Sequence, residues 1–146
     1  MIETKVFNAV NKPTVKEKSD IVNFLSENLD QYGDPKKDIL KAIDYSLKEI
    51  ASFGGFVMSL SDNSKIKAAT VINQTGMGGY IPENILVYIA VHKDHRGEGL
   101  GKQLMSKAIK HSKGDIALHV EANNPAKFLY EKLGFTNPYL EMRLKK

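Results

Sequence analysis

A glycine-rich segment in the second half of the chain has the residue types and spacing of an anion-binding turn. It runs from Arg96 to Gly101, and it lies between an apolar stretch, Ile85 to Val91, and an amphipathic stretch, Leu100 to Ser112. A buried strand therefore leads into a turn that begins a helix. The first turn of a helix has unpaired backbone N–H groups and a partial positive charge, and glycine lets an anion approach the backbone. We predict that this corner binds the phosphates of a cofactor.

The spacing of the glycines excludes two other phosphate-binding motifs. The dinucleotide fingerprint G-x-G-x-x-G would need a glycine where the chain has Lys102 or Leu104. The triphosphate loop G-x-x-x-x-G-K-[ST] would need a glycine in place of Arg96 and a hydroxyl side chain in place of Gln103. The pattern that remains is Arg-x-x-Gly-x-Gly, from Arg96 to Gly101.

This pattern resembles the acetyl-CoA-binding loop of the GNAT superfamily of N-acetyltransferases. GNAT enzymes commonly carry a second motif after the next strand, N-x-x-A-x-x-x-Y-x-x-x-G-F. The chain has that motif at the same spacing, with Asn123, Ala126, Tyr130, Gly134 and Phe135. The resemblance is close over residues 85–135 and rests on element order alone in the N-terminal half.

The resemblance implies an enzyme that moves an acetyl group from acetyl-CoA to a primary amine. The chain has no cysteine, which excludes an acyl-cysteine intermediate. The simplest mechanism is then direct attack of the amine on the thioester in a ternary complex, where catalysis is mostly positioning. The acceptor is open between a small-molecule amine and a peptide amine. The alternative function is a CoA- or acyl-CoA-binding module without catalysis.

The acetyl-CoA site implied by the resemblance is made mainly of backbone. The pantetheine arm would pair with the strand backbone at Ile89, Ala90 and Val91, where an N–H group would polarise the thioester carbonyl. Asn123 would bind the arm or cap the following helix. The remaining expected contacts are the pyrophosphate loop and the second motif: Arg96, Gly97, Glu98, Gly99, Leu100, Gly101, Lys102, Ala126, Phe128 and Tyr130.

Tyr130 is the strongest candidate for a catalytic side chain. By resemblance it would lie near the cofactor sulfur and protonate or hydrogen-bond the departing thiolate. The alternative is a packing role beside Leu129 and Leu133. The strand at 85–91 contains no carboxylate, so the general base is open. One candidate is a chain of water molecules. A second is Glu83, which alternation along the strand would place on the same face as Ile85, Val87 and Ile89. The others are His119 or Glu121, on one face of the next strand.

Composition narrows the class of protein. The chain has 146 residues, 42% of them hydrophobic and 26% charged, which indicates one globular domain over residues 1–146. Its net charge of +4 is uneven, because residues 92–146 hold 11 basic and 6 acidic side chains, an excess beside the expected phosphate site. The chain has no arginine cluster and no basic patch interleaved with aromatic residues, so we expect no nucleic-acid partner.

We expect neither a metal site nor a membrane segment. His92 and His95 have no carboxylate partner at ligand spacing, and cysteine ligands are absent. No apolar run approaches the roughly 20 residues that span a bilayer. The absence of cysteine fits a cytoplasmic protein. The oligomeric state is open, with a homodimer as one option.

The order of elements along the chain predicts a mixed α/β sheet with the GNAT order β-α-α-β-β-β-α-β-α-β. Thr14 to Glu17 form a capping box that begins the first helix, and Asp34-Pro35 is expected to begin the second, with Asp34 as the N-cap. Gly54-Gly55 should end the second helix, and Gly134 the last one. The expected strands are Glu3–Ala9, a hairpin at 56–60 and 66–73, a strand at 85–91 covered on both faces, 116–121 and 139–144, with a flexible loop at 74–84.

Overall fold

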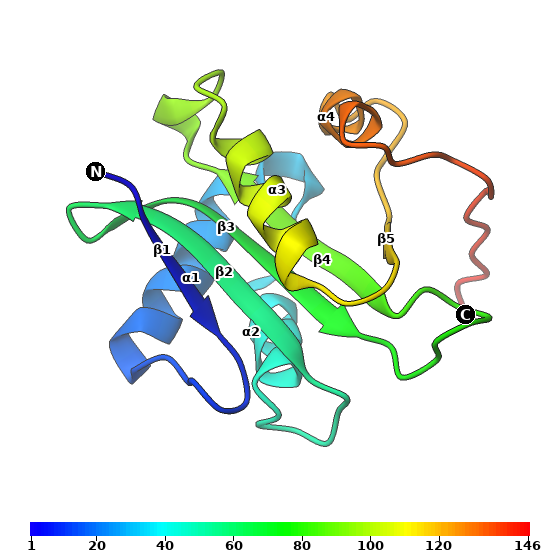
Figure 1. The fold of residues 1–146 in the computed structure, drawn as a ribbon, viewed down its shortest axis with the longest axis horizontal. Helices are drawn as coiled ribbons and strands as arrows, with labels where there is room; N and C mark the ends of the chain where they lie inside the picture. The colour runs from blue at the N-terminus through cyan, green and yellow to red at the C-terminus, as the bar shows by residue number, and fades with distance from the viewer.

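The computed structural model describes residues 1–146 and shows one five-stranded sheet with helices on both faces (Figure 1). The first four strands are antiparallel, and the fifth runs parallel to the fourth. The strands, in sheet order, are β1 (Glu3–Phe7), β2 (Gly55–Asp62), β3 (Lys65–Gln74), β4 (Asn84–Val91) and β5 (Ile116–Leu118). The helices are α1 (Val15–Asn28), α2 (Lys36–Ser46), α3 (Leu100–His111) and α4 (Ala126–Lys132), with short 3-10 turns η1 (Asp30–Tyr32) and η2 (Lys93–His95).

Two apolar cores lie on opposite faces of the sheet. Because successive side chains of a strand point to opposite faces, each inner strand contributes to both cores. In Figure 1, α1 and α2 lie behind the sheet, and α3 crosses in front of it. The core behind the sheet joins α1 and α2 to β2, β3 and β4, and the core in front joins α3 and α4 to the same strands. The predicted α/β class is confirmed, and no helix is both long and apolar enough to cross a membrane.

The first helix begins as its sequence predicts. The backbone N–H of Glu17 donates to Thr14 Oγ1 at 3.1 Å, and the N–H of Thr14 donates to Glu17 Oε1 at 2.9 Å. This reciprocal pair is a complete capping box, and it satisfies two backbone donors at the start of α1.

The predicted start and end of the second helix are wrong. The N-cap of α2 is Pro35, and no side chain caps the helix. Asp34 instead accepts a hydrogen bond from the hydroxyl of Tyr88, far away in the sequence. The helix ends at Ser46, well before Gly54, because Lys48 takes a left-handed conformation with φ +56°.

The β2–β3 hairpin is confirmed, with a turn at Asn63 and Ser64, both of which have positive φ. The β3–β4 loop between Gln74 and Asn84 is tied at its base by a hydrogen bond from the Thr75 N–H to the Glu83 carbonyl at 2.9 Å. The first strand ends at Phe7 rather than Ala9, because Asn8 Oδ1 accepts the N–H groups of Val10 and Asn11 and turns the chain.

A β-bulge interrupts β4. Val71 pairs with Tyr88 and Ile72 pairs with Leu86, so Val87 is an extra residue on β4. Val87 and Tyr88 therefore both face the α1–α2 core, although they are consecutive in the strand. The strand is covered on both faces as predicted, except at Ile85, which is 36% exposed.

The C-terminal part of the sheet is shorter than predicted. β5 ends at Leu118 rather than Glu121, and it pairs only with the first residues of β4, Asn84 to Leu86. The predicted strand at 139–144 does not form, and Tyr139 is 84% exposed. A strand needs a backbone partner, and the three-residue β5 offers a very short edge for pairing.

Candidate active site

The turn that begins α3 has unpaired backbone donors. The backbone N–H groups of residues 96–102 donate no hydrogen bond within the protein, and no side chain caps the helix. Gly97 and Gly99 have φ values of +82° and +81°, a conformation that other residues adopt only with strain. A Cβ atom at either glycine would meet no protein atom within 4 Å, so the space beside the turn is open. The turn can therefore hold an anion on several N–H groups.

The third glycine of the motif has a different role. A Cβ atom on Gly101 would lie 3.3 Å from Leu129 Cδ2 and 3.6 Å from Val91 Cγ2. Gly101 thus allows α4 to pack closely against α3 and the end of β4. Two glycines of the motif set the turn, and the third sets the packing behind it.

The side chain of Arg96 binds the end of α1 and the η1 turn that follows it. Its guanidinium donates to Asp30 Oδ2 and to the Asn28 carbonyl, each at 2.8 Å, and to the Val91 carbonyl at 3.2 Å. The hydrogen bond from Arg96 is the main cause that lowers the pKa of Asp30. Asp30 also has a φ of +55°, so this contact holds a strained residue in place. Arg96 therefore ties the turn to the segment between α1 and α2, a role that the motif did not predict.

The carboxylate of Glu98 is held beside a histidine. Glu98 Oε2 lies 3.4 Å from His95 Nδ1, and His95 Nε2 lies 3.0 Å from Lys67 Nζ. His92 has a separate role, because its Nδ1 accepts the N–H of Asp94. No group of three or more His, Cys, Asp or Glu side chains is placed to hold a metal ion.

A cleft of about 290 Å³ opens where β4 and β5 part. Their pairing stops at Leu86 and Leu118, so the rest of β4 has no strand on that side. The cleft is lined by β4, by the segment after β5, by α4 and by the link between α1 and α2. The residues on these walls include Leu29, Tyr32, Asp34, Ile85 to Ile89, His119 to Glu121, Asn124 and Tyr130.

Tyr130 lies in this cleft and is held by the end of its own helix. The N–H of Phe135 donates to the Tyr130 carbonyl at 3.0 Å, and the N–H of Gly134 donates to the Glu131 carbonyl at 3.1 Å. These two bonds form a Schellman cap, and the Tyr130 and Phe135 rings meet at 5.8 Å. The motif spacing thus fixes the position of Tyr130 through the helix C-terminus.

The chemistry of Tyr130 is that of a hydrogen-bond donor. The side chain is 7% exposed, and burial raises its pKa to about 12. Its hydroxyl has no hydrogen-bond partner in the protein and is not sealed from solvent. A thiol has a pKa of about 8.5, so full proton transfer from Tyr130 to a thiolate is unfavourable, whereas donating a hydrogen bond to it is not.

The cleft holds a second polar pair, which the sequence did not indicate. The hydroxyl of Tyr88 donates to Asp34 Oδ2 at 2.5 Å. Burial, followed by the contact with Asp34, raises the pKa of Tyr88. Asp34 itself is exposed and lines the cleft. The local pattern Asp-Pro indicated only a helix start, because the partner of Asp34 lies on a distant strand.

Of the candidate bases, His119 and Glu121 line the cleft, and Glu83 does not. Glu83 lies at the opposite end of β4, where its carboxylate accepts the N–H groups of Asp115 at 2.7 Å and Gly79 at 3.2 Å. These backbone hydrogen bonds lower its pKa. The bulge also breaks the parity that linked Glu83 to Ile89. His119 Nδ1 lies 4.0 Å from Glu141 of the C-terminal segment.

Of the remaining residues predicted to contact the cofactor, some line the cleft and others do not. Ile89 lines the cleft. Ala90 and Val91 follow Ile89 on the same strand but do not line the cleft. Asn123 does not cap α4, whose N-cap is Pro125 with no side-chain cap, and Asn124 Oδ1 accepts the Ala126 N–H at 2.9 Å. The Asn123 carbonyl instead accepts the hydroxyl of Tyr32 at 3.4 Å. Asn123, Ala126 and Phe128 do not line the cleft, and Phe128 is 58% exposed.

Comparisons with known proteins agree with this geometry. A family model described as an acetyltransferase (GNAT) domain matches residues 55–137. No curated protein sequence matches the chain.

Solved structures show the same fold at low sequence identity. The aminoglycoside N-acetyltransferase AAC(6')-Iy in complex with CoA is 13% identical, with a TM-score of 0.72 over 100% of this chain and 95% of that one. A possible acetyltransferase from Clostridium difficile 630 is 17% identical, with a TM-score of 0.70 over 100% and 97%. The ribosomal-protein-alanine N-acetyltransferase from Brucella melitensis biovar Abortus 2308 is 14% identical, with a TM-score of 0.67 over 100% of both chains.

Proposed function

The chain belongs to the GNAT acetyltransferase family, and on that premise we propose that it transfers an acetyl group from acetyl-CoA to a primary amine. The observation that carries the proposal is the run of unpaired N–H groups at residues 96–102, which begins five residues after the open edge of β4 ends. This arrangement offers one site for a diphosphate and, beside it, one site for an extended arm.

The cofactor would be bound through backbone. The N–H groups at 96–102 would hold the pyrophosphate, with the positive end of α3 behind them. The peptide-like pantetheine arm would follow the unpaired edge of β4 past Ile89 and into the cleft. A backbone N–H near the bulge at Val87 would then polarise the thioester carbonyl, a contribution of about 2.7–4 kcal/mol in comparable sites.

The acetyl transfer itself needs little covalent chemistry from the protein. The amine nitrogen attacks the thioester carbon, the C–N bond forms, the C–S bond breaks and the thiolate leaves. Tyr130 would donate a hydrogen bond to that thiolate, in keeping with its buried ring and raised pKa. An amine that binds as its ammonium ion loses one proton before it attacks and a second once the C–N bond has formed, and His119, Glu121 or water in the cleft would accept these protons.

The charges of the cleft suit an amine acceptor. Asp34 and Glu121 line the cleft, and no lysine or arginine does. Asp34 Oδ2 is bonded to Tyr88, and Oδ1 has no partner in the protein. Asp34 would therefore attract the acceptor in its ammonium form, which is more than 99.9% of a lysine-type amine at pH 7.

Two measurements test the proposal and separate it from a CoA-binding module without catalysis. Calorimetry with CoA should show saturable binding, and a thiol-release assay with acetyl-CoA should respond to members of an amine panel. CoA binding with no thiol release above the hydrolysis rate, for any amine class, would favour the binding module. Absence of CoA binding at millimolar concentrations would overturn both functions.

The Tyr130→Phe variant tests the assigned role. We expect kcat to fall about ten- to a hundredfold, the range for loss of a hydrogen bond to a charged group, while the Kd for CoA changes little. The matched control is Tyr139→Phe, at an exposed tyrosine outside the cleft. Unchanged kcat in Tyr130→Phe would leave Tyr130 with a packing role only.

A further inference from the structure

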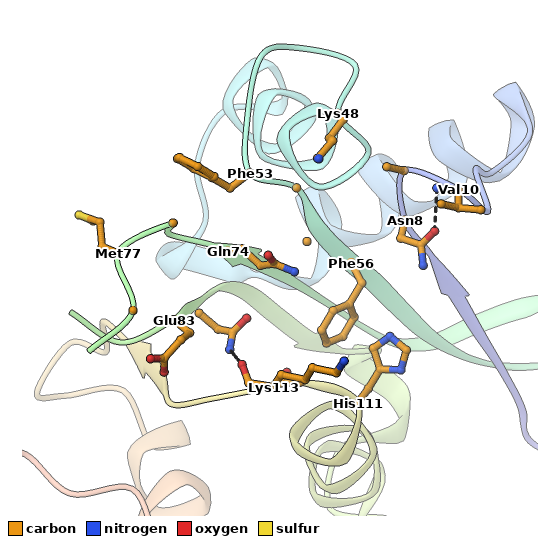
Figure 2. A pocket seen from close by; sticks show the side chains of 17 residues that line it. Asn8, Val10, Lys48, Phe53, Phe56, Gln74, Met77, Glu83, His111 and Lys113 are labelled. Atoms are coloured by element: carbon orange, nitrogen blue, oxygen red, sulfur yellow. Dashed lines mark hydrogen bonds between the residues drawn. The ribbon is translucent and has the colours of Figure 1, made fainter. Parts of the chain in front are cut away.

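A second cavity lies at the opposite end of the sheet from the α3 turn. Its volume is about 610 Å³, and it shares no lining residue with the cleft. Its walls come from the turn after β1, the segment after α2, the β3–β4 loop and the end of α3 (Figure 2). The proposed acetyl transfer uses none of these residues.

The floor of this cavity is aromatic. Phe56 is 6% exposed, and its ring meets the His111 ring edge-on, with centroids 4.6 Å apart. Phe53 and Met77 lie on the opposite side of the cavity in Figure 2, and both are exposed. An apolar ring can therefore lie against Phe56 with further apolar contacts at the rim.

The polar groups around that floor are mainly donors without partners. Lys48, His111 and Lys113 line the cavity, and none of their side chains makes an ion pair or a hydrogen bond within the protein. In Figure 2 the amine of Lys113 and the ring of His111 point toward each other beside Phe56. The side-chain N–H groups of Asn8 and Gln74 are also unused.

The one carboxylate on the wall, Glu83, makes no ion pair with these cations. Glu83 Oε1 accepts the Asp115 N–H, and Oε2 accepts the Gly79 N–H, so both oxygens hold loop backbone. Asn84 Nδ2 donates to the Lys113 carbonyl at 2.7 Å and fixes the wall on that side. The cavity is therefore held open by hydrogen bonds that do not involve its free donors.

We propose that this cavity is a second ligand site, which binds a small organic anion carrying a flat apolar group. Lys113 and His111 hold the carboxylate or phosphate, Lys48 adds charge from the opposite wall, and the ring of the ligand packs on Phe56. The excess of donors disfavours cationic ligands. The apolar floor gives a ring-bearing anion more contact than an anion without a ring.

The test is an NMR titration with four probes: benzoate, phenyl phosphate, acetate and benzylamine. We expect saturable shifts of the His111 ring and of the Gly76 and Gly78 amides with benzoate or phenyl phosphate at millimolar concentrations. Acetate should bind at least several-fold more weakly, and benzylamine should not bind there. Benzoate and phenyl phosphate distinguish a carboxylate ligand from a phosphate ligand of the same shape.

Variants give the second arm of the test. The double variant Lys48→Gln/Lys113→Gln should weaken binding of the preferred anion roughly tenfold or more, because two charge-assisted contacts are lost. The control is Lys37→Gln/Lys41→Gln, at two exposed lysines of α2 outside the cavity. Equal binding of benzylamine and benzoate by the unmodified protein would overturn the proposal. Shifts confined to residues 96–102, or no loss in the double variant, would also overturn it.

Discussion

Helices α1 and α3 begin in opposite ways. The first turn of α1 is closed by its own side chains, because Thr14 and Glu17 each accept an N–H group of the other. The first turn of α3 follows Gly99, has no side-chain cap and leaves the N–H groups at 96–102 unpaired. At α1, side chains of the helix start itself satisfy two backbone donors. The open start of α3 leaves its donors for a ligand.

The two helix starts also differ in charge, because only α1 has an acidic side chain in its first turn. Glu17 lies in the first turn of α1, where a carboxylate offsets the positive end of the helix. The first turn of α3 has no carboxylate, and the one that precedes it, Glu98, lies beside His95.

The largest expected effect comes from giving the α3 turn a side chain. Gly99→Ala should weaken CoA binding about ten- to a hundredfold, because the left-handed backbone at Gly99 is strained by a Cβ and the N–H groups move. Calorimetry measures the Kd, and chemical denaturation measures stability. Gly79→Ala is the matched control, since Gly79 also has a positive φ and open space for a Cβ. Equal CoA affinity of the two variants would contradict an anion site at the α3 turn.

A smaller effect should come from the arginine behind the turn. In Arg96→Lys we expect the KM for the amine to rise several-fold, because the single lysine amine cannot replace the bonds to Asp30 and Asn28. These bonds position the segment that carries Tyr32 and Asp34 to the cleft.

The Kd for CoA should change less than about threefold in that variant, with Arg143→Lys in the exposed C-terminal segment as the control. If CoA affinity fell as far as in Gly99→Ala, the guanidinium would contact the phosphates instead.

Removing the cap of α1 should affect stability and leave ligand binding unchanged. Thr14→Ala should lower the free energy of unfolding by about 1 kcal/mol, the usual cost of an N-cap. Urea denaturation measures this change, and the exposed Thr136→Ala is the control. A loss of CoA affinity in Thr14→Ala would show that the two helix starts are not independent.

The smallest expected effect is a change in how the stability of the fold depends on pH, and it comes from Glu17 at the start of α1. Hydrogen bonding to the Thr14 N–H, and then to Lys5, lowers the pKa of Glu17. A carboxyl group with a lowered pKa in the folded state stabilises that state at neutral pH, and this stability is lost as pH falls below about 4.3. Glu17→Gln should therefore show a shallower loss of stability in acid than Glu131→Gln. If the two variants lost stability equally as the pH falls, Glu17 would make no contribution to the pH dependence.

Features that depend on near neighbours in sequence were predictable. The capping box at Thr14, the glycine turn before α3 and the helix end at Gly134 all follow from residues within a few positions of one another. The position of Tyr130 was predictable for the same reason.

Features that depend on distant contacts were not. Nothing near Asp34 indicates Tyr88, and nothing in the glycine motif indicates that Arg96 binds Asp30. The bulge at Val87 depends on the register of β4 with β3. Because of this bulge, Glu83 does not lie on the same face of the strand as Ile89, as its sequence spacing had suggested. The expected strand at 139–144 has the right alternation, but a strand forms only where another strand presents its edge.

The most direct test is an amide NMR titration with CoA. We predict that the amides of residues 97–102 shift with saturation and exchange more slowly with solvent, whereas the capped first turn of α1, residues 15–18, stays unchanged. Saturable CoA binding that leaves the amides at 97–102 unmoved would contradict the central claim that the open start of α3 holds the pyrophosphate.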